Sequence, residues 1–185
     1  MYDKMIEKIE NLLKNKENVI IAIDGRCASG KTTISEKLKE KFDCNVIHMD
    51  DFFLQPWQRT EKRLSIPGEN IDHERFLEEV LIPLFEKKNF LYRPFDCRTQ
   101  DFSKSVKVDV NKITVIEGSY SCHEKLRGYY DICVFTDVEE EEQLRRIEKR
   151  NGKEALEIFK NKWIPLEEKY FKTFDIKGKS EIVIK

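Results

Sequence analysis

The strongest constraint on the fold is a glycine-rich loop that separates an apolar run from a helical pattern. The apolar run, Val19 to Ile23, is typical of a short buried strand. Gly25, Gly30, Lys31 and Thr32 then complete the pattern G-x-x-x-x-G-K-[ST]. After the loop, apolar residues recur at every fourth position, as on one face of a helix. The order of strand, loop and helix therefore predicts a loop that binds phosphate groups.

The residues of this loop have the chemistry that a polyphosphate requires. Backbone N–H groups, together with the positive end of the following helix, can surround the phosphates. Lys31 is predicted to reach the outer phosphates and the Thr32 hydroxyl to coordinate Mg²⁺. The nucleotide-binding residues are expected to be Gly25, Arg26, Cys27, Ala28, Ser29, Gly30, Lys31, Thr32 and Thr33.

Four further apolar runs predict the rest of a sheet. Several of them are apolar on both faces and are separated by helical patterns, which favours a parallel sheet covered by helices. We therefore expect an α/β fold with five parallel strands. The four runs are 45–50 (NVIHMD), 113–118 (ITVIEG), 131–137 (DICVFTD) and 181–184 (EIVI).

The segments between the strands have weaker signals. Residues 1–18 are expected to contain an amphipathic helix, and Asp72 is expected to cap a second helix that Pro83 kinks. Segments 89–96 and 105–110 are predicted to form a small β-ribbon at one edge. Segment 54–71 contains two prolines and a glycine without periodicity, so it is predicted to be a long surface loop.

Three carboxylates follow predicted strands, at the edge of the sheet where open α/β folds bind ligands. Glu117 ends the run 113–116 and could hold a water of a bound Mg²⁺. Asp50 is the first choice for the base that takes a proton from an acceptor hydroxyl. Asp51 is the alternative that could face the site or contact the acceptor.

Arginines and an acceptor pocket would complete a phosphotransfer site. Arg146 and Arg150 lie four residues apart on a predicted helix and are the expected catalytic arginines, although surface ion pairing explains each of them almost as well. The following segment, within 138–172, is expected to form a helical lid. Residues that could line the acceptor pocket are Asp51, Asp72, His73, Tyr92, Arg93 and Arg98.

Composition limits the classes of partner. The 34 basic and 35 acidic residues give a formal net charge of -1, which argues against nucleic acid or a membrane surface as the partner. Five cysteines without a C-x-x-C pair suggest reduced thiols. We expect a soluble, cytoplasmic protein with one domain over residues 1–185 and a small-molecule partner. Whether the chain forms a homo-oligomer stays open.

The ordered set of motifs resembles the uridine kinase and phosphoribulokinase group of P-loop kinases. The strings that carry it include DGRCASGKTT, HMDDFFL, NIDHERF, YRPFDC and VIEGSYS. The resemblance implies ATP or GTP as donor, Mg²⁺, a P-loop fold with a helical lid, and transfer of the γ-phosphate to a hydroxyl. By position, Asp50 matches the group's acceptor-activating aspartate and Glu117 its strand-end acid. Arg145, Arg146 and Arg150 resemble its lid arginines.

The acceptor is the part that the sequence leaves open. The first hypothesis is a kinase of a nucleoside such as uridine or cytidine, or of another alcohol of similar size. The alternatives are a kinase of a nucleoside monophosphate or vitamin precursor, and a partner-driven P-loop ATPase without a small acceptor. A guanine-selecting switch would have Asn-Lys-x-Asp, whereas the nearest string, NKWI at 161–164, lacks the aspartate.

Overall fold

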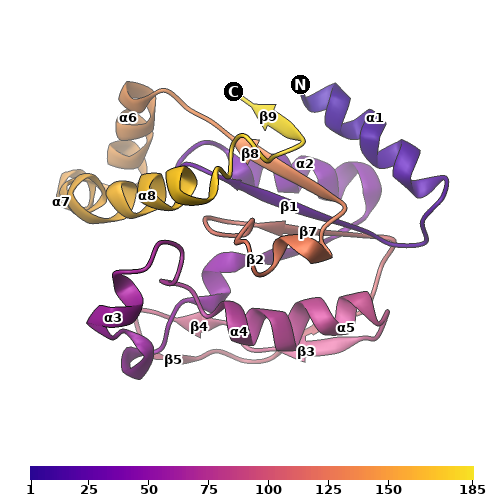
Figure 1. Cartoon of the computed structure of the whole chain (residues 1–185), viewed down its shortest axis with the longest axis horizontal. Helices are drawn as coiled ribbons and strands as arrows, with labels where there is room; N and C mark the ends of the chain where they lie inside the picture. Colours follow the sequence, from indigo (N-terminus) through magenta and orange to yellow (C-terminus); the bar gives the residue numbers. More distant parts are fainter.

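The computed structural model describes residues 1–185 and has a central sheet of five parallel strands between two layers of helices (Figure 1). The strand order is β2-β7-β1-β8-β9, so that β1 lies at the centre of the sheet. The predicted α/β fold with five parallel strands is therefore confirmed. The strands are β1 Val19–Gly25, β2 Asn45–His48, β7 Ile113–Glu117, β8 Ile132–Thr136 and β9 Ile182–Ile184.

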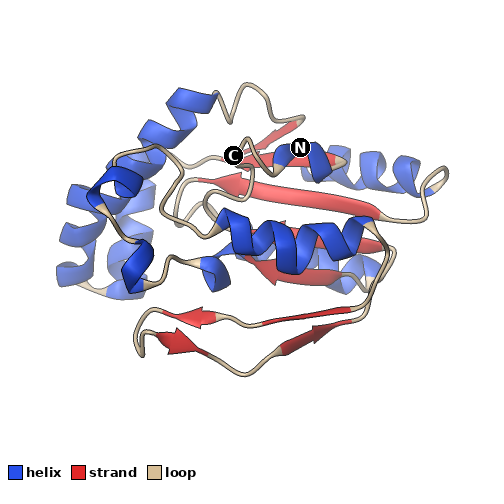
Figure 2. Cartoon of the chain, turned by 60° about the horizontal axis from the view of Figure 1, so that its bottom comes forward, coloured by secondary structure: helices blue, strands red, loops and turns tan.

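Apart from the short helix α3, the helices divide into three groups around the sheet (Figures 1 and 2). Helices α1 and α2 cover one face, and α4 and α5 cover the other. Helices α6, α7 and α8 lie beyond the carboxyl ends of the strands, where the predicted lid was expected. None of the helices combines the length and the apolar composition that a bilayer crossing requires. Their bounds are α1 Tyr2–Leu13, α2 Lys31–Phe42, α3 Glu61–Leu64, α4 His73–Phe76, α5 Ile82–Phe85, α6 Glu140–Asn151, α7 Lys153–Ile158 and α8 Ile164–Phe174.

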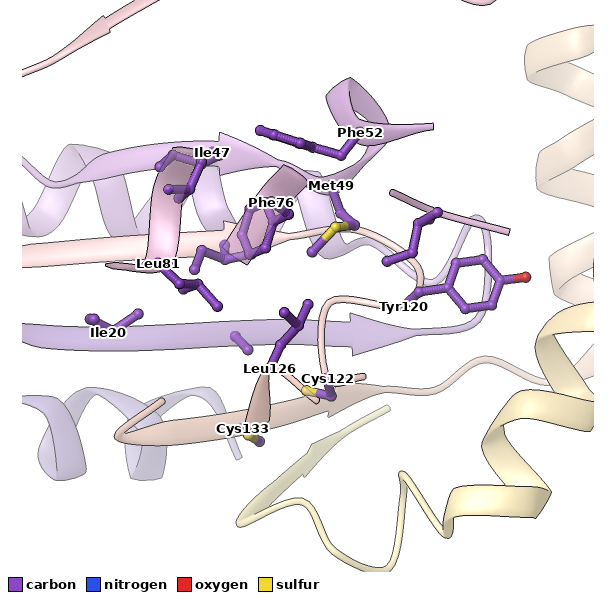
Figure 3. Packing of buried hydrophobic residues seen from close by; sticks show 14 of the residues in the cluster. Ile20, Ile47, Met49, Phe52, Phe76, Leu81, Tyr120, Cys122, Leu126 and Cys133 are labelled. Carbon is purple, nitrogen blue, oxygen red and sulfur yellow. The ribbon is translucent and has the colours of Figure 1, made fainter. Parts of the chain in front are cut away.

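Strand β1 is buried on both faces because its side chains alternate between two apolar clusters. Ile20 and Ala22 contribute to the cluster that includes Phe76 of α4, part of which Figure 3 shows. Ile21 and Ile23 contribute to the opposite cluster, which includes residues of α1 and α2. The two clusters fix the sheet between its helical layers, and the carboxyl end of β1 is thereby held in place.

Two helices contain a π-helical segment just before a proline. The segment Leu77–Leu81 lies between α4 and α5 and precedes Pro83, and the segment Phe159–Trp163 lies between α7 and α8 and precedes Pro165. Proline has no N–H to donate, so the carbonyl four residues earlier loses its usual partner and the helix adjusts locally. The first of these segments lies where a kink at Pro83 was predicted, and the second one was not foreseen.

The predicted β-ribbon is present but is not part of the central sheet. Strand β3, Phe90–Tyr92, pairs antiparallel with β6, Val106–Val108. A second pair joins β4, Phe95–Asp96, to β5, Asp101–Phe102. These pairs form two separate two-stranded sheets, which lie below the central sheet in Figure 2.

The prediction of a long irregular loop over residues 54–71 is wrong in part. The segment contains a short 3-10 helix, Pro56–Gln58, and helix α3, which the Thr60 hydroxyl caps by accepting a hydrogen bond from the Arg63 N–H. An antiparallel bridge between Phe53 and Ile71 closes its base. Short helices of this length have no periodicity that a sequence pattern can reveal.

Candidate active site

The glycine-rich loop lies between β1 and α2, at the carboxyl edge of the sheet. A Cβ at Gly25, whose φ is 133°, would lie 2.1 Å from the carbonyl oxygen of Thr136, so only glycine fits where the loop leaves the strand. Gly30 caps α2 with a φ of 99°. The Lys31 Nζ donates to the carbonyl oxygens of Gly25 at 2.6 Å and Arg26 at 2.9 Å. The loop therefore combines the N-terminus of a helix with a nearby ammonium group.

Helices α6 and α8 hold the first half of this loop. From α6, the Gln143 Nε2 donates to the Cys27 carbonyl at 3.1 Å. From α8, a Glu167 carboxylate oxygen accepts from the Cys27 N–H at 3.0 Å. The Arg26 guanidinium is held in an ion pair with Glu168, with Nε and Oε1 2.6 Å apart. Its Nη1 also donates to Asp137 at 2.7 Å, so the predicted nucleotide-binding residue Arg26 is held by α8 and by the segment after β8 and does not line the cavity.

Thr32 and Glu117 meet at the start of α2. The Thr32 hydroxyl and the nearer Glu117 oxygen are 3.4 Å apart. Glu117 is buried at the end of β7, and its oxygen is also 2.5 Å from the Nδ1 of His48. The hydrogen bond to the Glu117 carboxylate raises the pKa of His48. Two oxygen donors of the kind that Mg²⁺ prefers therefore lie side by side next to the loop.

Of the two adjacent aspartates, Asp50 faces the site. A 3-10 turn over Met49–Phe52 continues from β2 and directs the two side chains differently. Asp50 lines the same cavity as Lys31, and burial raises the pKa of its carboxyl while the Lys31 charge opposes that rise. Asp51 instead accepts a hydrogen bond from the Tyr92 hydroxyl at 3.1 Å, outside the cavity lining.

One cavity of about 1640 Å³ joins these groups to the lid helices. Arg146 and Arg150 line it from α6, whereas Arg145 does not. The Arg146 Nη1 donates to the Ala28 carbonyl of the loop at 3.1 Å, and its Nε contacts Glu142 at 2.7 Å. Both predicted catalytic arginines are therefore on the cavity side of α6, and one of them already contacts the phosphate-binding loop.

The chain is similar to proteins of known class over most of its length. No family model matches it. A uridine kinase from Anoxybacillus flavithermus is 27% identical over 150 residues, which cover 75% of this chain and 70% of that protein. A uridine kinase from Limosilactobacillus reuteri is 27% identical over 151 residues, which cover 75% of this chain and 68% of that protein. The chain is therefore similar to uridine kinases over about three quarters of its length.

The fold comparison agrees with this relationship. The solved structure of a possible uridine kinase from Bacillus stearothermophilus matches with a TM-score of 0.70 at 19% identity, over 98% of this chain and 100% of that one. A candidate fructose transport system kinase from Silicibacter sp. TM1040 matches with a TM-score of 0.73 at 18% identity, over 100% of this chain and 99% of that one. The predicted resemblance and P-loop fold are confirmed, and the similarity to uridine kinases indicates a P-loop phosphotransferase that acts on a hydroxyl acceptor.

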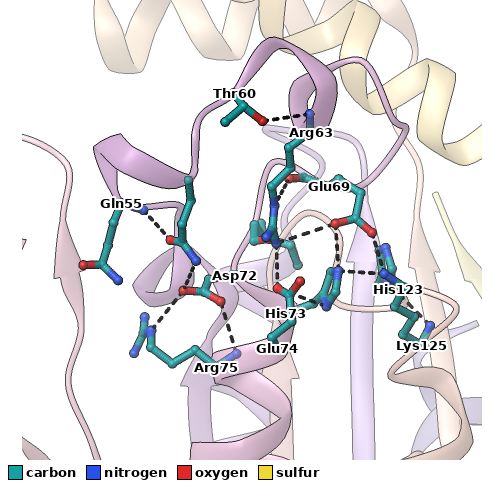
Figure 4. Close-up of polar contacts among 12 residues, drawn as sticks. Gln55, Thr60, Arg63, Glu69, Asp72, His73, Glu74, Arg75, His123 and Lys125 are labelled. Atoms are coloured by element: carbon teal, nitrogen blue, oxygen red, sulfur yellow. Dashed lines mark hydrogen bonds and ion pairs between the residues drawn. The ribbon is translucent and has the colours of Figure 1, made fainter.

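Two residues predicted to contact the acceptor are instead part of a buried polar network (Figure 4). Asp72 caps α4 by accepting from the Arg75 N–H, and its other oxygen accepts from the Gln58 amide at 2.9 Å. His73 is 3% exposed, contacts Glu69 at 2.9 Å and does not line the cavity. The structure does not bring Asp72 or His73 to the cavity wall, because partners elsewhere in the chain bury them.

The predicted acceptor residues of the ribbon are also outside the cavity lining. Tyr92 is 4% exposed and bonded to Asp51. Arg93 donates to the carbonyls of Ser103 and Phe102. Arg98 pairs with Asp96 at the surface, with its side chain 91% exposed. The Tyr92 hydroxyl is held by the turn after β2, and Arg93 and Arg98 are held by neighbours in their own hairpins. The positions of these residues therefore do not support the predicted acceptor wall.

Another part of the chain lines the acceptor side of the cavity. Apolar groups of Phe53 and Leu54 lie beside the polar groups of Arg59, Asn70 and Cys97. Arg59 and Asn70 belong to the segment 54–71, which was predicted to be a surface loop. The only sequence signal that pointed to them was the unusual length of that segment, because loops of this length are often functional.

Asp24 is a buried acid that the sequence reasoning missed. It is fully buried at the end of β1 and accepts hydrogen bonds from the N–H groups of Gly25, Tyr120 and Cys122 at 2.7, 3.1 and 2.9 Å. The Tyr170 hydroxyl of α8 donates to it at 2.9 Å. Asp24 thus ties the loop, the segment after β7 and helix α8 together. The sequence feature that could have identified Asp24 is the presence of an acidic residue at the end of an apolar run, directly before the first glycine of the loop.

We expect Tyr170→Phe to lower the free energy of unfolding by about 1.5–3 kcal/mol, because it removes a hydrogen bond to a buried carboxylate. Urea denaturation at neutral pH measures this difference. Tyr130→Phe is the matched control, since the Tyr130 hydroxyl is buried without a hydrogen-bond partner and its removal should be nearly neutral. Equal losses in the two variants would contradict the role given to Tyr170.

The pH dependence of stability gives a second test of Asp24. Burial raises the pKa of its carboxyl from 3.8 to about 6. Between these values the folded chain binds more protons than the unfolded chain, so the contribution of Asp24 to stability is largest at the acidic end and declines as pH rises. We expect the free energy of unfolding of the wild type to fall by about 2 kcal/mol, relative to that of Asp24→Asn, when the pH rises from about 4 to about 7. If the free energies of unfolding of the two proteins, measured by urea denaturation, changed with pH in the same way, this expectation would be wrong.

Proposed function

We propose that the chain transfers the γ-phosphate of ATP to a hydroxyl of a nucleoside, uridine- or cytidine-like, or of another alcohol of similar size. The observation that supports this most directly is the presence of Lys31, Glu117 and Asp50 around one cavity, with two arginines of α6 on its other side. Phosphoryl transfer requires a bound polyphosphate, a metal site, and a carboxylate at the acceptor. The names of the relatives agree with a nucleoside acceptor.

In this proposal the side chains act by position and charge. Lys31 would leave its two loop carbonyls to contact the outer phosphates, and Arg146 and Arg150 would contact the transferring group, whose charge is spread over several oxygens. Asp50 would orient the acceptor hydroxyl and take its proton. No covalent intermediate on the protein is required.

The residues present fit a magnesium ion. Thr32 and Glu117 offer a hydroxyl and a carboxylate oxygen 3.4 Å apart, and Mg²⁺ commonly binds through one or two protein oxygens while it retains waters and contacts phosphates. A bound magnesium ion would neutralise charge on the phosphates. We propose Thr32 and Glu117 as the residues that hold it, with the Thr32 hydroxyl closest to the loop.

We propose that residues 1–185 form one kinase domain, in which residues 138–172 comprise the lid and the C-terminal helices. Gln143, Glu167 and Arg146 join this segment to the glycine-rich loop. These contacts support the assignment, because an opening of the lid would change them. A cytoplasmic location agrees with five unpaired cysteines, which are typical of reducing compartments. ATP is proposed as the donor by analogy with the relatives, and GTP would replace ATP in a parallel turnover assay.

The test is Mg²⁺-dependent ADP formation from ATP, with and without uridine, cytidine, other nucleosides, nucleoside monophosphates, pantothenate and simple sugars. Lys31→Ala serves as the blank for contaminating activity. A large acceptor-dependent rate that the blank lacks would support a small-molecule kinase and identify the substrate. Slow hydrolysis that no acceptor stimulates, together with dependence on Lys31, would favour a P-loop ATPase instead.

A further inference from the structure

The Glu117 carboxylate, which is proposed to hold magnesium, has one anchored oxygen and one free oxygen. Its Oε1 lies 2.5 Å from the His48 Nδ1 and 3.4 Å from the Thr32 hydroxyl. No group of the protein forms a hydrogen bond with its Oε2. Because an ionised carboxylate only accepts hydrogen bonds, the His48 Nδ1 carries the hydrogen of the short contact. The protein therefore fixes Glu117 through one oxygen and leaves the other available at the cavity.

The pairing of two parallel strands brings His48 and Glu117 together. Strand β2 is at the edge of the sheet, and β7 is its neighbour (Figure 1). The register places His48 opposite Glu117, and each of them is the last residue of its strand. Side chains of residues opposite each other in neighbouring strands project from the same face of a sheet. The contact is thus a consequence of the sheet and not a chance meeting of two surface side chains.

The two partners differ in exposure, and this difference separates their roles. The Glu117 side chain is 8% exposed, whereas the His48 side chain is 46% exposed and does not line the cavity. His48 therefore lies outside the space that nucleotide and acceptor would fill, and it can act on them only through Glu117. A glutamate side chain has three rotatable bonds, so its carboxylate has several orientations unless a partner holds it. A hydrogen bond from the imidazole removes this freedom before a ligand binds.

We propose that His48 is a positioning residue of the magnesium site: its Nδ1–H holds the Glu117 Oε1, so that Oε2 stays free for the ion or for one of its waters. The inference rests on the proposed function, because it takes Thr32 and Glu117 as the residues that hold Mg²⁺. Carboxylates that bind a metal are themselves held by hydrogen bonds, and loss of such an outer partner lowers metal affinity about 10- to 100-fold. No proton transfer is assigned to His48.

The test measures ADP binding by calorimetry twice, once with saturating Mg²⁺ and once with EDTA. The ratio of the two affinities reports how much the protein gains from the ion. We expect His48→Ala to lower the affinity for ADP about 10-fold in Mg²⁺ and to leave it unchanged in EDTA. Asn45→Ala is the matched control, because it removes a side-chain hydrogen bond, to the Asp109 carbonyl, at the other end of the same strand. It should leave both affinities unchanged.

Two conservative substitutions test whether Nδ1 is the nitrogen that matters. The amide nitrogen of asparagine is bonded to Cγ, as Nδ1 is, whereas that of glutamine is one bond further from the backbone, as Nε2 is. We therefore expect His48→Asn to restore most of the affinity for ADP in Mg²⁺ and His48→Gln to restore little of it. In a double-mutant cycle, His48→Ala should cause no further loss once Glu117→Gln is present.

An unchanged affinity for ADP in Mg²⁺ with His48→Ala would overturn the proposal. Equal losses in Mg²⁺ and in EDTA would do the same, and so would a better rescue by glutamine than by asparagine. Turnover judges the proposed function separately. A loss confined to Mg²⁺ in His48→Ala, in a protein that transfers phosphate to no acceptor, would support the positioning role and refute the kinase. Lys31-dependent transfer, with an unchanged affinity for ADP in His48→Ala, would support the kinase and refute the positioning role.

Discussion

Replacement of Lys31 by alanine is expected to lower the rate of phosphoryl transfer by about 10³-fold or more. Lys31 is the cation of the glycine-rich loop, and its ammonium is held by two loop carbonyls at the site where the outer phosphates would bind. Without it, the charge that develops on the transferring group and on the leaving ADP loses its nearest fixed partner. The measurement is Mg²⁺-dependent ADP formation with the best acceptor, at saturating ATP.

The fold should survive this substitution, because Lys31 is not part of either apolar cluster. We expect the free energy of unfolding to change by no more than about 1 kcal/mol, since the lost bonds to the carbonyls are offset by the removal of a largely buried charge. Lys39→Ala, on the exposed side of the same helix, is the matched control and should keep full activity. Retained transfer in Lys31→Ala would refute the phosphate-binding role of the loop.

Asp50→Asn is expected to reduce kcat by about 10²- to 10⁴-fold while ATP affinity changes little. Asparagine keeps the size of the side chain but cannot take a proton from the acceptor hydroxyl. The experiment measures kcat with the best acceptor and, separately, the equilibrium binding of ATP with Mg²⁺. A base acts in the transition state, so only the first quantity should fall steeply.

A different outcome would assign Asp50 another role. If nucleotide binding and transfer weaken together, Asp50 is a metal ligand rather than the base. Asp51→Asn is the neighbouring control, because the Asp51 carboxylate is bonded to the Tyr92 hydroxyl and lies outside the cavity lining. It should cause a smaller loss than Asp50→Asn. The opposite ranking would mean that the 3-10 turn presents Asp51 to the acceptor.

The phosphate end of the site could be predicted from the sequence because its parts are consecutive. A strand, a glycine-rich turn and a helix start occur within Val19 to Phe42, and local geometry alone places the loop N–H groups and Lys31. The strand-end acid Glu117 followed from a single further rule, that parallel strands end at one edge of the sheet. The choice between Asp50 and Asp51 depended on a turn of four residues whose direction has no sequence signature.

The acceptor end was decided by contacts between distant parts of the chain. His73 and Asp72 have the chemistry of ligands, but Glu69 and Gln58 hold them in a buried network outside the cavity. Arg59, in a segment without periodicity, lines the cavity instead. Whether a polar residue lines the cavity or is held elsewhere depends on partners that are distant in the chain, and no sequence pattern identifies those partners.

The sequence by itself determined the α/β class, the order of strand, loop and helix, and the loop that binds phosphate, because these depend on neighbours within a few residues and on the alternation of apolar side chains. Only the tertiary structure decided which carboxylates and arginines face the cavity. Asp24 makes the difference plain: its position in the chain is visible in the sequence, yet its role comes from donors at Tyr120, Cys122 and Tyr170, which folding alone brings together.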